Sequence, residues 1–84
     1  MLNVEIISPE GIIFQGPCYL TTLPAYEGEL GVMEDHEAFV AELLAGEVTV
    51  YNDKQEIVKK VEVKTGGFAE IHNGKRLVVL LDSQ

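Results

Sequence analysis

The residues best suited to chemistry lie in one stretch, from Ala25 to Val40. It holds five carboxylates, His36, Gly28 and Gly31, contains no lysine or arginine, and has neither a helical nor a strand periodicity. A polar segment of this length is often a functional loop, because loops escape the packing constraints of the core. The alternative is a solvated connection without a role.

Motifs typical of enzymes and metal centres are absent from the sequence. It has no glycine-rich phosphate loop and no GxSxG, CxxC or HExxH motif. The residues at 34–37 are clustered, but neighbouring positions of an extended chain point to opposite sides and cannot all face one ion. A metal site made from His72 and Cys18 is the remaining alternative. We therefore expect no catalytic residue, no metal and no cofactor.

Three isolated residues each allow a functional and a structural interpretation. His36 is either a pH-sensitive contact residue or an exposed loop histidine. Cys18 is the only cysteine, so it cannot form an internal disulfide, and we expect a small buried hydrophobe in a reducing compartment. Asp53-Lys54 at a hairpin tip is weakly similar to lipoyl- and biotinyl-carrier domains, although no methionine flanks Lys54.

The charge of the chain is unevenly distributed. The net charge is −8, and residues 1–53 hold ten acids and no lysine or arginine, whereas residues 54–84 hold four acids and all six bases. Nucleic acid is an unfavourable partner, because phosphate binding requires a basic patch. A cationic protein partner is the better match, and the alternative is that the acids only keep a small domain soluble.

The elements that must position the acidic stretch are β-strands. Alternating or β-branched runs predict strands over 2–6, 12–14, 18–23, 38–44, 47–51, 57–63, 68–71 and 77–81. The run 38–44 could also form one helical turn, but Gly46 follows too closely for a longer helix, so we expect a strand. We expect Gly16-Pro17 to break the second strand, Pro24 to end the third, and the apolar run 77–81 to lie inside on both faces. Asn73-Gly74 is a strong hairpin signal.

Composition and length indicate one globular domain. The 84 residues are 46% hydrophobic, no apolar run approaches a membrane span, and the N-terminus has no basic region ahead of an apolar core. We expect a soluble protein without an export signal. Short strands separated by turns predict an all-β sandwich or barrel.

Several motifs occur in a familiar order. They are Ser8-Pro9-Glu10-Gly11 followed by Phe14-Gln15-Gly16, then Glu27-Gly28-Glu29-Leu30-Gly31-Val32, then His36, and finally Gly66-Gly67-Phe68 before an aliphatic strand. This pattern resembles the epsilon subunit of bacterial F-type ATP synthases, and the resemblance covers essentially all 84 residues.

The resemblance implies a single domain over 1–84, a flattened β-sandwich of about ten short, mostly antiparallel strands. It implies a noncatalytic rotor subunit of the central stalk that links the gamma subunit to the c-ring and couples proton flow to ATP synthesis. Such a subunit is peripheral to the cytoplasmic face of the bacterial inner membrane and is held there by protein contacts. The alternative is a generic acidic β-sandwich adaptor for a basic partner.

The resemblance also implies two sets of contact residues. Glu29 is the expected ionic partner of a basic turn on the c-ring. The expected c-ring contacts are Glu27, Glu29, Leu30, Gly31, Glu34, Asp35 and His36, and the expected gamma contacts are Tyr26, Phe39 and Val40. A rotor subunit needs two distinct surfaces, so an exposed apolar patch separate from the acidic loop would favour it over the adaptor.

Two departures from the family pattern are visible. The run from Glu34 to Ala38 replaces the Pro-Gly-His-Ala-Pro that the family usually carries, which makes the loop more acidic. Family members commonly continue into a two-helix C-terminal domain, whereas this sequence stops at Gln84, either naturally or because it is truncated. In either case, we expect these residues neither to inhibit by helix insertion nor to bind ATP as that domain does.

Overall fold

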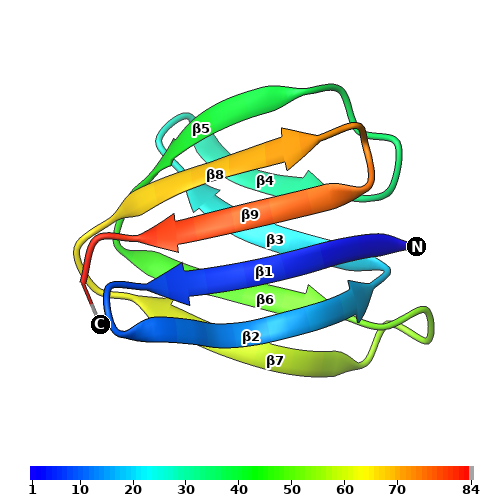
Figure 1. Cartoon of the computed structure of the whole chain (residues 1–84), viewed down its shortest axis with the longest axis horizontal. Coiled ribbons are helices and arrows are strands. Elements are labelled where there is room, and N and C mark those ends of the chain that lie inside the picture. Colours follow the sequence, from blue (N-terminus) through cyan, green and yellow to red (C-terminus); the bar gives the residue numbers. More distant parts are fainter. Residues whose placement is uncertain (84) are drawn as a thin grey trace.

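The computed structural model describes residues 1–83, which form nine β-strands and no helix (Figure 1). The all-β prediction is therefore confirmed, with nine strands in place of about ten. The strands are β1 (Leu2–Ser8), β2 (Gly11–Cys18), β3 (Leu20–Ala25), β4 (Gly28–Val32), β5 (Phe39–Leu43), β6 (Gly46–Tyr51), β7 (Ile57–Val63), β8 (Gly67–His72) and β9 (Arg76–Leu81).

The strands form one sheet that folds over into two layers. Its order is β2-β1-β9-β8-β5-β3-β6-β7, and β4 pairs with β3 beside this path. Figure 1 shows β8, β9, β1 and β2 in front of β4, β3, β6 and β7. The pairing of β1 with β9 is parallel, and the other strand pairs are antiparallel.

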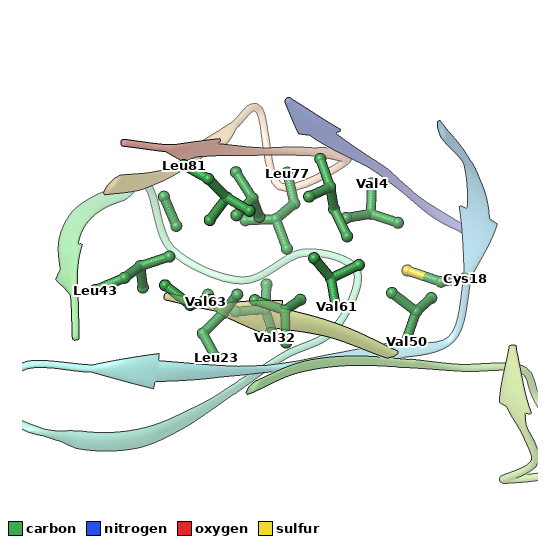
Figure 2. Close-up of a cluster of buried hydrophobic side chains, with 14 of the residues drawn as sticks. Val4, Cys18, Leu23, Val32, Leu43, Val50, Val61, Val63, Leu77 and Leu81 are labelled. Atoms are coloured by element: carbon green, nitrogen blue, oxygen red, sulfur yellow. The ribbon is translucent and has the colours of Figure 1, made fainter. Parts of the chain in front are cut away.

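The core lies between the two layers, because alternate side chains of each strand point inward. Leu2, Val4 and Ile6 of β1 are buried, as are Leu77 and Val79 of β9. They pack against buried residues from both layers (Figure 2). Each fully buried aliphatic side chain of this size contributes about 1.5–3 kcal/mol, so the two-residue alternation is what holds the sandwich together.

Cys18 is buried at the end of β2, as the sequence predicted. Its Sγ lies 3.3 Å from the Thr21 Oγ1. Burial raises the pKa of the Cys18 thiol, and the contact with Thr21 opposes that shift only in part. The thiol is therefore kept protonated and behaves as a small core side chain.

The structure corrects two predicted breaks at prolines. Gly16-Pro17 does not interrupt β2, which runs to Cys18 and pairs Pro17 with Asn3 of β1. Because β2 is an edge strand, it tolerates a residue without an N–H. Pro24 likewise lies within β3, where its carbonyl accepts a hydrogen bond of 2.8 Å from the Leu44 N–H.

The expected burial of 77–81 on both faces is also wrong. Leu77, Val79 and Leu81 point into the core, but Val78 is only half-buried and Leu80 is 42% exposed. The layer that contains β9 is therefore covered on its inner face alone. The Asn-Gly hairpin before this strand is confirmed, since Asn73 and Gly74 take φ values of 56° and 67°.

Candidate functional site

The stretch from Ala25 to Val40 is part hairpin and part loop, not the single loop that its composition suggested. Tyr26 and Glu27 form the tip of the β3–β4 hairpin, and Ala25 pairs with Gly28, whose φ of 129° is readily accessible only to glycine. The strand β4 then alternates, with Leu30 and Val32 inward. Glu29 and Gly31 point outward.

The hairpin tip and the β5–β6 turn form an acidic end of the molecule. A shallow groove there is lined by Glu29 and Glu47, with Pro24 and Leu44 between them. Glu47 is partly neutralised, because its Oε1 lies 3.4 Å from the Lys60 Nζ. Within residues 1–83, neither Glu27 nor Glu29 makes an ion pair. Both exposed carboxylates are therefore available to a cationic partner.

Glu34 and Asp35 lie at the opposite end of β4. The Glu34 Oε1 is 3.1 Å from the N-terminal ammonium of Met1, and the Asp35 N–H donates to the Gly74 carbonyl. A Cβ at position 74 would stand 2.9 Å from the Asp35 Cα, so glycine permits this close contact. Glu29 and Glu34 are five positions apart in the sequence, which corresponds to at most roughly 16 Å of extended chain.

A groove of 380 Å³ lies between β4 and β5. His36 lines this groove, where its side chain contacts Phe39 and the backbone. Its ring meets the Phe39 ring edge-on, with centroids 5.0 Å apart, and its Nδ1 is 2.9 Å from the Glu37 carbonyl oxygen. The groove gathers residues that the sequence assigned to different partners. They are Tyr26, Phe39 and Val40 from the gamma set and Glu27, Leu30 and His36 from the c-ring set.

The outer face of β5, β8, β9, β1 and β2 carries a feature that sequence reasoning missed. Phe68 pairs with Leu80, Leu80 with Ile7, and Ile7 with Ile12, so four apolar side chains lie side by side across four strands. We call these four residues the apolar stripe. Outward alternation in 76–81, combined with the hairpin register, was the signal that could have revealed it.

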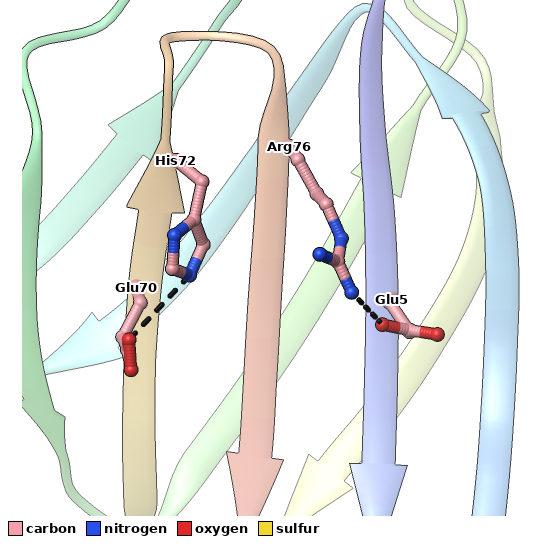
Figure 3. A network of polar contacts seen from close by, with 4 residues as sticks. All are labelled: Glu5, Glu70, His72 and Arg76. Atoms are coloured by element: carbon pink, nitrogen blue, oxygen red, sulfur yellow. Dashed lines mark hydrogen bonds and ion pairs between the residues drawn. The ribbon is translucent and has the colours of Figure 1, made fainter.

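Two ion pairs lie beside the apolar stripe on the same face (Figure 3). The Arg76 Nη2 is 3.1 Å from the Glu5 Oε1, and the His72 Nε2 is 3.5 Å from the Glu70 Oε2. The Glu5 side chain is only 15% exposed, so its pair is the better shielded of the two. The Arg76 guanidinium is thus already engaged within the sheet.

Metal and membrane features are not seen among residues 1–83. No group of three or more His, Cys, Asp or Glu side chains is arranged to hold a metal ion there. In the same range, no helix has the length and apolarity needed to span a bilayer. What the described residues present to a partner is therefore an acidic end, a groove beside it and an apolar face.

Several known proteins are similar to this chain in sequence. An ATP synthase epsilon chain of Campylobacter jejuni (strain RM1221) is 33% identical over 79 residues, which cover 94% of this chain and 60% of that protein. One of Rickettsia bellii (strain OSU 85-389) is 36% identical over 70 residues, covering 83% and 65% respectively. The chain therefore spans a little under two thirds of these relatives.

Solved structures share the fold. A chain in a cryo-EM structure of the Euglena gracilis mitochondrial ATP synthase, described as OSCP/F1/c-ring, superposes with a TM-score of 0.84 at 23% identity, over 95% of this chain and 49% of that one. A chain in the Tetrahymena thermophila central stalk/c-ring structure gives 0.75 at 17% identity, over 96% and 63%. Residues 1–83 match the family described as ATP synthase, Delta/Epsilon chain, beta-sandwich domain, and the chain belongs to that family.

Proposed function

We propose that this chain is a noncatalytic subunit of the central stalk of an F-type ATP synthase, bound to the gamma subunit on one surface and to the c-ring on another. In that position it would help couple proton flow to ATP synthesis at catalytic sites on other subunits. It would be peripheral to the membrane, on the cytoplasmic face in a bacterium. Membership of the delta/epsilon family and the relatives named as epsilon chains support this role.

One structural observation carries the proposal beyond family membership. The molecule has two exposed surfaces of different chemistry, and they lie on different layers. Glu29 and its groove belong to the layer of β3, β4 and β6, whereas the apolar stripe lies on the outer face of β8, β9, β1 and β2. A subunit held between two partners needs such a pair of surfaces. A single acidic adaptor surface does not require the apolar stripe.

We assign the c-ring contact to the acidic end, with Glu27 and Glu29 as its ionic residues. The Glu27 carboxylate is exposed at the hairpin tip and the Glu29 carboxylate is exposed near the start of β4, where Pro24 and Leu44 form an apolar floor beside it. A basic side chain could rest its aliphatic part on that floor and direct its charge to the carboxylate. Glu34 and Asp35 stay predicted contacts, and they would require an interface that runs the length of β4.

A charge reversal tests this assignment. Glu29→Lys should weaken binding to the c-ring by roughly tenfold or more, since it replaces attraction by repulsion at an ionic contact. The change should leave the free energy of unfolding within about 0.5 kcal/mol of wild type, because the position is exposed. Asp53→Lys, an equal charge change at the exposed β6–β7 turn, is the matched control.

Binding to detergent-solubilised c-ring is measured by biolayer interferometry, and stability by urea unfolding. Equal binding of the Glu29→Lys and Asp53→Lys variants would remove the acidic end from the c-ring contact. A large loss of stability in Glu29→Lys would instead show that Glu29 has a structural role.

A further inference from the structure

The apolar stripe is too exposed to be explained by folding. Phe68 is 48% exposed, Leu80 is 42% exposed and Ile12 is 58% exposed. Neighbouring strands stand about 4.8 Å apart, so four side chains in register extend roughly 14 Å across the sheet. Single exposed apolar residues are ordinary on a protein surface, but a contiguous row indicates an interaction site.

Further apolar surface flanks the stripe on the same face. Val78 lies two residues from Leu80 on β9 and is half-buried, and Val40 of β5 is 71% exposed. The register Val40–Glu70–Val78–Glu5 forms the next row, in which Val78 lies between Glu70 and Glu5 and Val40 lies at the end, beside Glu70. The surface that a partner would cover is thus apolar along the stripe and mixed beside it.

The residues at the positions nearest the stripe are acidic, and one of them, Glu5, is paired with the Arg76 guanidinium. Glu42 lies in register with Phe68 at one end of the row. Glu70 and Glu5 are each two residues from a member of the stripe along its own strand, and Asp82 and Glu10 are two residues from Leu80 and Ile12, just outside the strand ends. Among the described residues at these neighbouring positions, none is cationic. Arg76 and His72 lie one row farther away and are paired with Glu5 and Glu70 (Figure 3).

We infer that the apolar stripe receives a segment of the gamma subunit that carries apolar side chains in its centre and Lys or Arg residues on both sides. Apolar residues on this segment would remove Phe68 and Leu80 from water, and its cations would face the surrounding carboxylates. This inference rests on the proposed function and specifies the chemistry of the gamma contact.

A second copy of this chain is a poorer occupant. Two stripes brought face to face would also bring their acidic surroundings together, in a protein whose net charge is already −8. Like charges that face each other across an interface are unfavourable. The c-ring is not the occupant in this scheme, because the acidic end that we assign to it lies on the other layer.

The test is the affinity of the full 84-residue chain for the gamma subunit of the same organism, measured by isothermal titration calorimetry. Phe68→Ser and Leu80→Ser should each weaken binding by roughly tenfold, the range expected for a central apolar contact. Ile57→Ser is the matched control, since Ile57 is 51% exposed on β7 of the other layer and should change affinity less than twofold. Thermal melts identify any variant that loses its fold.

The charge complementarity is tested separately. Glu42→Lys should weaken binding about fivefold and reduce its dependence on salt, whereas Asp53→Lys should do neither. Hydrogen exchange on the complex then identifies the gamma segment that becomes protected, and this segment should be rich in Lys and Arg. A protected segment that is acidic or uncharged would overturn the inference.

The outcomes separate this inference from the proposed function. If gamma binds and the Phe68, Leu80 and Glu42 variants match wild type, the proposed function stands and the docking surface is wrong. If wild-type chain does not bind gamma at all, both fall. Loss of affinity confined to the stripe and Glu42 variants supports both.

Discussion

Gly67 is the position where one added methyl group should do the most damage. It pairs with Leu81 at the start of β8, and a Cβ built there would lie 2.1 Å from the Leu80 carbonyl oxygen. Real Cβ atoms essentially never come closer than 3.0 Å to another heavy atom, so Gly67→Ala leaves a shortfall of 0.9 Å that backbone must absorb. The strands β8 and β9 would have to separate at this point.

Separating β8 from β9 would lower the stability of the fold through poor packing and lost backbone hydrogen bonds. Overpacking of a well-packed site costs about 1–3 kcal/mol, and a buried backbone group left without its hydrogen bond costs a similar amount. We therefore expect Gly67→Ala to lower the free energy of unfolding by about 2–5 kcal/mol. For 84 residues the total stability is roughly 4–13 kcal/mol, so the loss would be a large part of it. Binding to gamma should also weaken, because Phe68 and Leu80 flank the disturbed pair.

Urea unfolding followed by far-UV circular dichroism measures this change, and Gly16→Ala is the matched control. A Cβ at position 16 would meet only the Phe14 ring, at an ordinary distance of 3.8 Å, so that variant should stay within about 0.5 kcal/mol of wild type. If Gly67→Ala unfolds at the same urea concentration as Gly16→Ala, the close packing of β8 on β9 described here is refuted.

Two further predictions concern the core. Leu77→Ala should lower the free energy of unfolding by about 3–5 kcal/mol in the same urea assay, because Leu77 is fully buried between the layers. A loss under about 1 kcal/mol would contradict that placement. Burial raises the pKa of the Cys18 thiol above its ordinary value of 9.0, so the unfolded chain releases the proton first and stability should fall as pH rises beyond that value. The stability difference between wild type and Cys18→Ala should therefore shrink above that pH. Iodoacetamide should also alkylate Cys18 far more slowly in the native than in the urea-unfolded protein, and equal rates would show an accessible thiol.

The sequence predicted most of the sandwich because its strands obey a two-residue alternation. The run 2–6, the hairpin of 47–51 with 57–63, and the Asn73-Gly74 turn all carry a local signal that tertiary packing reinforces. Prolines misled the prediction for a physical reason. For Pro17 the reason is that an edge strand tolerates a residue without an N–H, and local sequence does not reveal that β2 is at the edge of the sheet. Pro24 lies in β3, which has neighbours on both sides, and there its carbonyl still takes part in the strand pairing through the Leu44 N–H.

The candidate site was harder to predict than the fold. The strand β4 has only Leu30 and Val32 pointing inward, which is too short an alternation to stand out among glycines and acids. Glu29 lies near the start of β4 and Glu34 lies just past its end, so the extended chain between them divides a site that looked continuous in the sequence. Leu80 was expected in the core, because an exposed apolar residue that contacts a partner is of the same type as a buried one.

The most direct test of the central-stalk role is native mass spectrometry of the 84-residue chain mixed with the gamma subunit of the same organism. The proposed function predicts a complex with one copy of each, and predicts that the assembly then binds the c-ring. A chain that is folded by circular dichroism but forms no complex with gamma would contradict a stalk role for these residues. Family membership would then describe the fold and not the function of this chain.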